Sequence, residues 1–217
     1  MHCSPIWKPK WRVHEGYKVR FVVSGTDTDI GKTVFCAGLA GMLGARYWKP
    51  VQAGVPGDSE IVTELAGVEI LPEAWRLKMP ASPHQAAADE GITIDPDSLV
   101  PPQGPVVIEG AGGLMVPLTR TSLFIDVFAR WKLPLILCAR TRLGTINHTL
   151  LSIEAVRARS IPLHGIAFIG DANPESETII AEIGQVKRLG RLPLIEPLTA
   201  GRLKTVFAQN FSVGDFA

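Results

Sequence analysis

A glycine-rich segment, Gly25–Thr33 (GTDTDIGKT), carries the strongest chemical signal in the sequence. It follows a short apolar run and precedes a helical pattern, which is where backbone N–H groups cradle phosphate oxygens. In such a loop Lys32 neutralises the β- and γ-phosphates and the Thr33 hydroxyl binds Mg²⁺. The spacing departs from the general motif, because five residues separate Gly25 from Gly31. The strand before it and the helix after it nevertheless favour a phosphate site over a chance Gly-Lys-Thr.

A phosphate loop needs a second carboxylate that holds the metal at the end of a neighbouring strand. Glu109 is the first polar residue after the apolar run Pro105–Ile108, in the segment PVVIEGAGG. Ligands of parallel α/β sheets bind at the carboxyl ends of the strands. We expect Glu109 there, followed by a glycine turn whose backbone approaches the ligand closely. A purely structural glutamate is the alternative.

Lys49 and Asp58 are further candidates, each with a plainer alternative. Lys49 follows Trp48 at the end of a second predicted strand, where a compact cation can hold a phosphoryl or carboxylate group. Taken alone, a solvated lysine is the favoured interpretation. Asp58 follows Gly57 and precedes a short helical pattern, so it is either a metal ligand or a helix N-cap, and alone the cap is favoured.

The segment Gly144–Thr149 (GTINHT) opens the best helical pattern of the chain. A glycine turn at a helix N-terminus binds anions through its free N–H groups. Asn147 either caps this helix or contacts a ligand. For His148 we favour a packed or polar role over a catalytic one.

The elements that position these residues alternate between strands and helices. Buried runs that alternate with helices indicate an α/β fold, a P-loop NTPase-like and mostly parallel sheet with helices on both faces. Gly91–Gly104 is predicted as a loop with at most one turn, at Pro96–Leu99. Strands are predicted at Arg20–Ser24, Tyr47–Trp48, Pro105–Ile108, Leu133–Ala139, Leu163–Ile169 and Arg191–Leu194. Helices are predicted at Lys32–Leu43, Ile61–Ala66, Pro83–Asp89, Phe124–Trp131, Ile146–Ile161 and Ser176–Val186.

Composition indicates an ordinary globular protein, with 46% hydrophobic and 20% charged residues among 217. The net charge of +1 gives no reason to expect a nucleic acid or an anionic membrane as partner. No apolar stretch approaches the roughly 20 residues that span a bilayer. We expect a cytoplasmic protein with three reduced cysteines, two of them in the core. Residues 1–18 are predicted to be an extension of unknown role, and residues 19–217 a single domain.

Together these segments resemble the dethiobiotin synthetase family. The resemblance covers about Arg20 to Pro197 and rests on GTDTDIGKT, WKPVQAG, SPH at Ser82–His84, EGAGGLMVPL, LGTINHTLL and GRLP at Gly190–Pro193. It implies an ATP- and Mg²⁺-dependent ligase that carboxylates 7,8-diaminopelargonate with CO₂ from bicarbonate. The carbamate is phosphorylated to a mixed anhydride, and the second amine closes a ureido ring. The family works as a homodimer whose substrate site is shared between subunits.

The resemblance also assigns roles to residues. Lys49 would hold the carbamate and the γ-phosphate, with Thr28 and Lys32 assisting. Mg²⁺ would be bound by Thr33, Asp58 and Glu109. The nucleotide would contact Asp29, Ile30, Gly31, Lys32, Thr33, Val34, Gly110, Ala111, Gly112 and Gly170, with Pro193 and Leu194 beside the adenine. The substrate would contact Lys49 and Ala53, with Gly144, Thr145 and Asn147 of the partner subunit receiving its carboxylate.

Three positions depart from the family pattern. Ala53 stands where relatives often carry serine or threonine, so one substrate hydrogen bond of about 1 kcal/mol is missing. Asp29 is one methylene shorter than the glutamate of some relatives, which we interpret as tolerable. Ile169 occupies the position where the resemblance leads us to expect an asparagine that reads the base. We therefore hypothesise that the nucleotide selectivity is relaxed.

Two other functions fit a phosphate loop. A nucleotide-switched ATPase that acts through partner binding typically carries a lysine early in this loop, and Gly25–Asp29 has none. An amidating synthetase of the cobyrinate type needs a glutamine-handling domain, for which 217 residues are too few.

Overall fold

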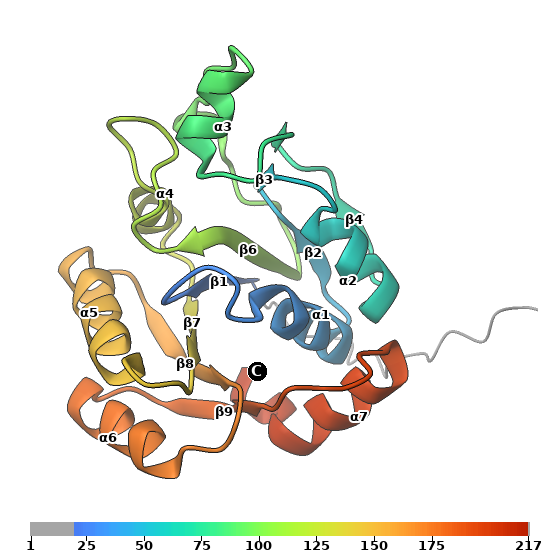
Figure 1. The fold of residues 1–217 in the computed structure, drawn as a ribbon, viewed down its shortest axis with the longest axis vertical. Coiled ribbons are helices and arrows are strands. Elements are labelled where there is room, and N and C mark those ends of the chain that lie inside the picture. Colours follow the sequence, from blue (N-terminus) through green and yellow to red (C-terminus); the bar gives the residue numbers. More distant parts are fainter. Residues whose placement is uncertain (1–19, 217) are drawn as a thin grey trace, which may run out of the picture.

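Seven strands form one parallel sheet at the centre of the molecule (Figure 1). The computed structural model describes residues 20–216, so the predicted extension 1–18 and Cys3 lie outside the described residues. All neighbouring strands run parallel, and their carboxyl ends therefore lie at one end of the sheet. The order across the sheet is β4 (Ile70–Leu71), β2 (Arg46–Trp48), β6 (Val106–Gly113), β1 (Arg20–Gly25), β7 (Leu135–Arg140), β8 (Leu163–Ile169) and β9 (Arg188–Leu192).

Helices cover both faces of this sheet (Figure 1). One face packs against α1 (Lys32–Leu43), α2 (Asp58–Ala66) and α7 (Ala200–Asn210). The other packs against α3 (Pro83–Asp89), α4 (Phe124–Trp131), α5 (Thr145–Ala158) and α6 (Pro174–Gly184). A separate parallel pair, β3 (Val51–Ala53) and β5 (Trp75–Leu77), and two short 3₁₀ turns, η1 (Pro96–Ser98) and η2 (Val213–Phe216), complete the described elements.

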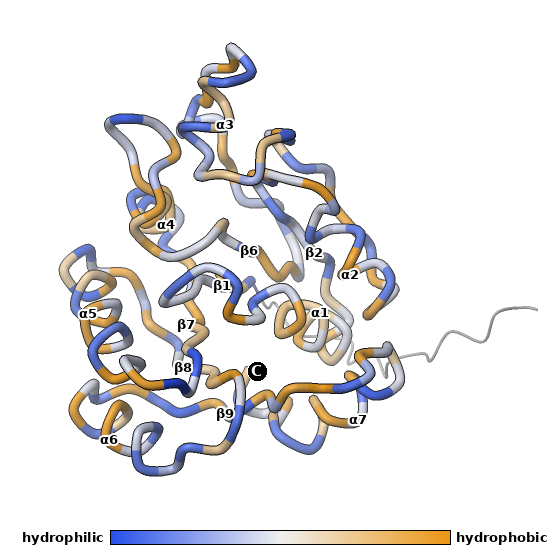
Figure 2. The backbone as a smooth tube through the Cα atoms, in the orientation of Figure 1, coloured by the Kyte–Doolittle hydropathy of each residue, from blue (hydrophilic) through white to orange (hydrophobic). Residues whose placement is uncertain are grey.

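Side chains of the central strands divide between two buried clusters. Phe21 and Val23 of β1 belong to the cluster on the α1 side, whereas Val22 between them belongs to the cluster on the opposite face. This alternation follows from the two-residue period of a strand, and it explains why a strand buried on both faces is apolar throughout. Figure 2 shows the consequence, with hydrophobic colour along the central strands and hydrophilic colour in most outer loops.

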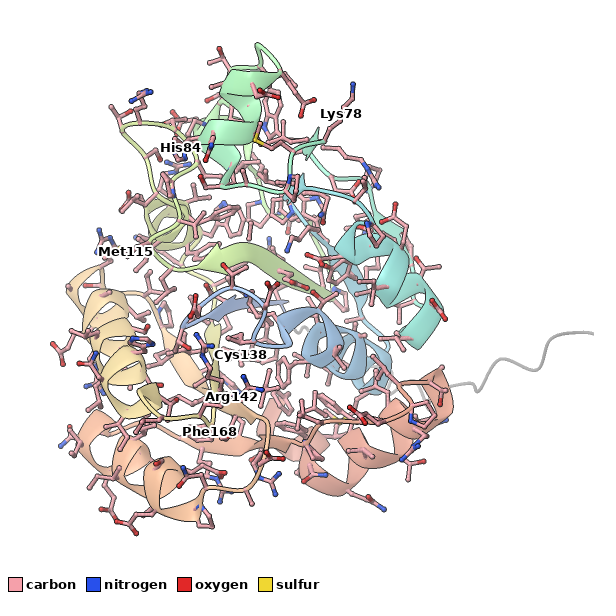
Figure 3. All side chains as sticks on the ribbon, viewed as in Figure 1. Lys78, His84, Met115, Cys138, Arg142 and Phe168 are labelled. Atoms are coloured by element: carbon pink, nitrogen blue, oxygen red, sulfur yellow. The ribbon has the colours of Figure 1, made fainter. Side chains whose placement is uncertain are left out.

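The predicted α/β fold and parallel sheet are confirmed. The helices Lys32–Leu43, Pro83–Asp89 and Phe124–Trp131 have the predicted bounds, and the loop Gly91–Gly104 contains only the turn η1. Cys36 and Cys138 are buried free thiols, and Cys138 lies near the middle of the molecule in Figure 3. Burial raises the pKa of both thiols, so both are uncharged at neutral pH.

Several local elements differ from those predicted. The strand does not end at Glu109 in a glycine turn, because β6 continues to Gly113. Its register with β1 shifts between the pairs Val23–Glu109 and Gly25–Gly113, and Gly112 has a positive φ of 60°, so the glycines form an irregularity within the strand. Strand β9 starts three residues before the predicted Arg191 and ends at Leu192. The β3–β5 pair and α7 were not predicted, because three-residue strands have no readable period and α7 packs through few apolar positions, with Leu203 and Phe207 fully buried.

Candidate functional site

The loop between β1 and α1 forms one wall of a cavity of about 770 Å³ at the carboxyl end of the sheet. Residues from Thr28 to Val34 all line this cavity. Gly31 adopts the left-handed conformation (φ 92°) and begins α1 without any side-chain cap. The N–H groups of the first helical turn therefore lack a side-chain partner, which is the arrangement that binds anions.

Lys32 lies in the wall of this cavity and is almost completely buried. Its Nζ donates a hydrogen bond to the backbone oxygen of Asp27 at 3.0 Å. Burial lowers the pKa of Lys32, with a smaller opposing effect from Glu109. An anionic ligand offsets the free-energy cost of burying a charged lysine. Lys32 is therefore well placed to pair with a phosphate.

A cluster of charged side chains faces the loop from β6, from the start of α2 and from the residue that follows β2. Lys49 Nζ lies 2.5 Å from Asp58 Oδ2 and 3.1 Å from Glu109 Oε1, and it donates to the Gly110 carbonyl oxygen at 3.3 Å. Thr33 Oγ1 lies 3.0 Å from a carboxylate oxygen of each acid, Asp58 and Glu109. The structure therefore brings the four residues together at the start of α1.

Lys49 keeps its charge although only 4% of it is exposed. Burial alone lowers its pKa, but the carboxylates of Glu109 and Asp58 outweigh that effect and hold the pKa above its ordinary value. The favoured interpretation of Lys49 as a solvated lysine is wrong. Its burial results from the convergence of three elements that are far apart in the sequence.

Asp58 is the first residue of α2, and Gly57 occupies the N-cap position. The interpretation of Asp58 as the N-cap is therefore wrong, and the helix begins three residues before the predicted Ile61. Because its side chain caps no backbone N–H, the carboxylate is free to bond Thr33 and Lys49.

The oxygen donors of this cluster suit magnesium. Mg²⁺ prefers hard oxygen ligands and usually keeps several waters beside one or two carboxylates and substrate phosphates. Thr33, Asp58 and Glu109 offer one hydroxyl and two carboxylates, with the hydroxyl within hydrogen-bond distance of both acids. Within residues 20–216 no three His, Cys, Asp or Glu side chains could hold a metal by themselves. An ion here would therefore take its other ligands from phosphate and water.

Two residues that contact the charge cluster, Tyr47 and Gln52, were not predicted from the sequence. Tyr47 donates from its hydroxyl to Glu109 Oε2 at 2.9 Å, and both side chains are buried. Burial and Glu109 raise the pKa of Tyr47, so the phenol stays neutral and fixes the carboxylate. Gln52 is also buried, and its side-chain oxygen accepts a hydrogen bond from the backbone N–H of Asp58. The two-residue period of a strand could have revealed Tyr47, since Tyr47 and Lys49 share a face.

A second cavity of about 430 Å³ continues beyond the loop and shares Asp29, Ile30 and Gly31 with the first. Ile169, Gly170 and Leu194 line it, whereas Pro193 is not among its lining residues. A Cβ at position 170 would lie 2.6 Å from Thr141 Oγ1, so a side chain at this position of the cavity wall would clash with Thr141.

The remaining candidates fall into two groups. Ala53, Ala111 and Gly112 line the first cavity, and Gly110 contributes its carbonyl oxygen to Lys49. Gly144, Thr145 and Asn147 line neither cavity. Gly144 and Asn147 are exposed, and the Thr145 hydroxyl is buried and donates to the Arg140 carbonyl oxygen. Within one chain, the start of α5 is therefore not brought to the phosphate loop.

Comparison with known proteins decides the family. A family model described as an AAA domain matches residues 19–202. The ATP-dependent dethiobiotin synthetase BioD of Rhodopseudomonas palustris (strain HaA2) is 61% identical over 202 residues, which cover 90% of this chain and 95% of the relative. The chain belongs to the dethiobiotin synthetase family. The resemblance of the motifs is thereby confirmed.

Other members of the dethiobiotin synthetase family are similarly close. Proteins of the same name are 57% identical in Sphingopyxis alaskensis (91% of this chain, 98% of the relative) and 59% identical in Agrobacterium fabrum (91% and 97%). Among solved structures, the ParA family ATPase of Chlorobium tepidum TLS matches with a TM-score of 0.50 and 12% identity. It covers 91% of this chain and 92% of its own, and it shows a shared fold only. None of the described helices is long and apolar enough to cross a membrane.

Proposed function

We propose that this chain is an ATP- and Mg²⁺-dependent dethiobiotin synthetase, a cyclo-ligase of biotin biosynthesis. Its substrates are 7,8-diaminopelargonate, CO₂ and ATP. The observation that carries the proposal is the buried cation Lys49, held between Asp58 and Glu109 opposite an uncapped phosphate loop. Membership of a family whose relatives carry this activity in their names supports it.

The reaction brings two anions together. One amine of the substrate adds to CO₂ and loses a proton, which gives a carbamate. A carbamate oxygen then attacks the γ-phosphorus of ATP and ADP leaves. Finally the second amine attacks the carbonyl carbon of the mixed anhydride, phosphate leaves, and the ureido ring closes.

The residues of the cavity are suited to the phosphoryl transfer. Lys49 and Lys32 bring two cations to the meeting point of carbamate and γ-phosphate, where they offset the repulsion before reaction. Thr28 lines the same cavity and assists at the γ-phosphate. Mg²⁺ held by Thr33, Asp58 and Glu109 supplies further positive charge to the phosphates. Lys49 and Glu109 are buried, and a labile carbamate bound against them would be partly shielded from water.

We assign the nucleotide to the loop and the second cavity. Asp29 to Val34 bind its phosphates with Gly110 to Gly112 opposite, and Gly170, Pro193 and Leu194 lie towards the base. Asn173 and Arg140 also border this cavity, but Asn173 caps α6 and Arg140 pairs with Asp27. Ile169, at the position where an asparagine was expected to read the base, brings only an apolar side chain to this cavity, which supports relaxed selectivity.

We further propose a cytoplasmic homodimer in which Gly144, Thr145 and Asn147 of one subunit receive the substrate carboxylate in the cavity of the other. The start of α5 is exposed, and the apolar side chains of Leu143 and Leu151 beside it face solvent in the single chain. Exposed apolar side chains around a polar site are typical of subunit interfaces. A neutral helix N-terminus binds a carboxylate without a second cation near the amines.

Phosphate release measures the proposed function directly. The purified protein with Mg²⁺·ATP should release phosphate only when both 7,8-diaminopelargonate and bicarbonate are present, with one dethiobiotin formed per phosphate. A nucleotide-switched ATPase, the alternative function, would hydrolyse ATP at a rate that responds to neither compound. That result would contradict the ligase function and favour the nucleotide-switched ATPase.

A further inference from the structure

The side chain of Gln52 makes three hydrogen bonds beside the charge cluster, although only 4% of the residue is exposed. Its Oε1 accepts from the backbone N–H of Asp58 at 3.0 Å. Its Nε2 donates to the carbonyl oxygens of Ala53 at 3.1 Å and Gly54 at 3.2 Å. One amide therefore ties the end of β3 to the first turn of α2.

The N-cap residue of helix α2 offers no side chain to the Asp58 N–H, and Gln52 supplies that acceptor instead. Gly57 has no side chain at the N-cap position, and Asp58 is the first helical residue. The loop between Gly54 and Gly57 gives little support, since Val55 and Pro56 are exposed. Gln52, which lies in β3, accepts the hydrogen bond that an N-cap side chain would otherwise accept. A capping bond contributes about 1 kcal/mol to helix stability.

The contact differs from those of the Asp58 carboxylate. That carboxylate bonds Thr33 and Lys49, and both partners have other roles in the proposed mechanism, with the metal and the phosphate respectively. When those partners turn to their ligands, the carboxylate loses bonds. The bond from Gln52 goes to the backbone of Asp58, so ligand binding leaves it in place.

We propose that Gln52 is a positioning residue for the metal site, which holds the start of α2 so that the Asp58 carboxylate stays in coordination range. This inference rests on the metal role proposed for Asp58. Gln52 lines the cavity, but the hydrogen bonds of its side chain all go to the backbone. Its loss should weaken metal binding while leaving the phosphate loop intact, because Lys32 and the N-terminus of α1 belong to other elements.

Two variants separate its donor from its acceptor. Gln52→Met keeps the length and removes both functions, whereas Gln52→Glu keeps an acceptor for the Asp58 N–H and loses the donor. Mn²⁺ serves as the probe, titrated by electron paramagnetic resonance against each protein loaded with a non-hydrolysable ATP analogue. We expect Gln52→Met to weaken Mn²⁺ binding about fivefold or more, the effect of a lost buried hydrogen bond. Gln52→Glu should weaken it less than Gln52→Met, because its carboxylate still accepts from the Asp58 N–H.

Two further measurements exclude a general structural effect. Analogue binding in EDTA should change less than about twofold in both variants, as expected if the phosphate loop is undisturbed. Thermal unfolding checks that each variant is folded, and Gln52→Glu serves if Gln52→Met is not. Equal losses of analogue binding with and without metal would overturn the proposal.

Glu109→Gln provides the reference for the metal site itself. If Glu109→Gln weakens Mn²⁺ binding and the Gln52 variants do not, the positioning role is wrong and the metal site stands. If neither position affects Mn²⁺ affinity, the proposed metal site is wrong and the role of Gln52 falls with it.

Discussion

The charge cluster at Lys49 and the start of α5 are both proposed to bind charged parts of the reactants, but they differ in how complete they are. Lys49 lies within hydrogen-bond distance of both Asp58 and Glu109 in a single chain, and Lys49 and Glu109 are almost completely buried. Gly144 and Asn147 are exposed and line no part of the main cavity.

The difference indicates a division of labour. The proposed phosphoryl-transfer site lies within one chain, because its oppositely charged side chains are brought together by the fold of that chain. The proposed carboxylate site at the start of α5 would need a second subunit. Changes in the first region should therefore affect the chemical step, and changes in the second should affect substrate affinity and assembly.

The largest effect is expected from Lys49→Gln. The variant keeps a polar side chain but loses the cation, so turnover should fall at least about 10²-fold, the scale of a lost electrostatic stabiliser. Nucleotide affinity, measured by calorimetry, should change little, because the loop and Lys32 remain.

Lys78→Gln is the matched control, because Lys78 is exposed and does not line the cavity. It should leave turnover unchanged. Near-wild-type turnover of Lys49→Gln in a folded protein, as judged by circular dichroism, would remove Lys49 from the mechanism.

A smaller effect is expected from Glu109→Gln. The amide still accepts a hydrogen bond from Tyr47 but no longer offers a carboxylate, so the Mg²⁺ concentration for half-maximal turnover should rise about tenfold or more. The measurement is a Mg²⁺ titration at saturating ATP. Glu64→Gln, on the exposed side of α2, should leave the requirement unchanged. An unchanged requirement in Glu109→Gln would indicate a purely structural residue.

Much of this cluster's framework could be predicted from the sequence, because local patterns encode it. Apolar runs bounded by glycine and proline placed β1, β7 and β8, and the glycine-rich loop placed the start of α1. The glycines at 110, 112 and 113 were interpreted as a turn. From the sequence alone, a glycine within a strand cannot be distinguished from a glycine in a turn, because the distinction depends on whether a neighbouring strand pairs with it. Here that neighbour is β1.

Burial of the charges could not be predicted in the same way. For Lys49 and Asp58 the sequence favoured other interpretations, a solvated lysine and a helix cap. Nothing in the local sequence distinguishes these from a buried ion pair. The answer depends on contacts between residues nine to sixty positions apart, such as Lys49 with Asp58 and with Glu109. Gln52 was missed for the same reason, since its partner is a backbone N–H of another element.

At the start of α5 we expect an effect on assembly and substrate affinity. Leu151 is exposed and lies one helical turn after Asn147, on the same face. Leu151→Asp should therefore weaken the proposed dimer, seen by light scattering, and raise KM for the diamine about tenfold by loss of substrate contacts.

Ile183→Asp on α6 provides the control, because Ile183 is also an exposed apolar residue but lies on another helix. It should change neither mass nor KM. A wild-type that is monomeric while fully active would contradict the shared site.

The smallest differences are expected among nucleotides. Ile169 offers no hydrogen bond to a base, and one such bond contributes about 1 kcal/mol. Turnover with GTP and CTP should therefore lie within about tenfold of that with ATP. Initial rates at saturating nucleotide measure this, and a strong preference for ATP would refute relaxed selectivity.

The central claim is that Lys49 and the two carboxylates gather around the terminal phosphate of ATP. A crystal structure with Mg²⁺, a non-hydrolysable ATP analogue and 7,8-diaminopelargonate tests it most directly. We expect Lys49 Nζ within hydrogen-bond distance of a γ-phosphate oxygen and one ion shared by Thr33, Asp58 and Glu109. A structure in which Lys49 turns away from the phosphate, or in which the ion is bound without either carboxylate, would contradict it.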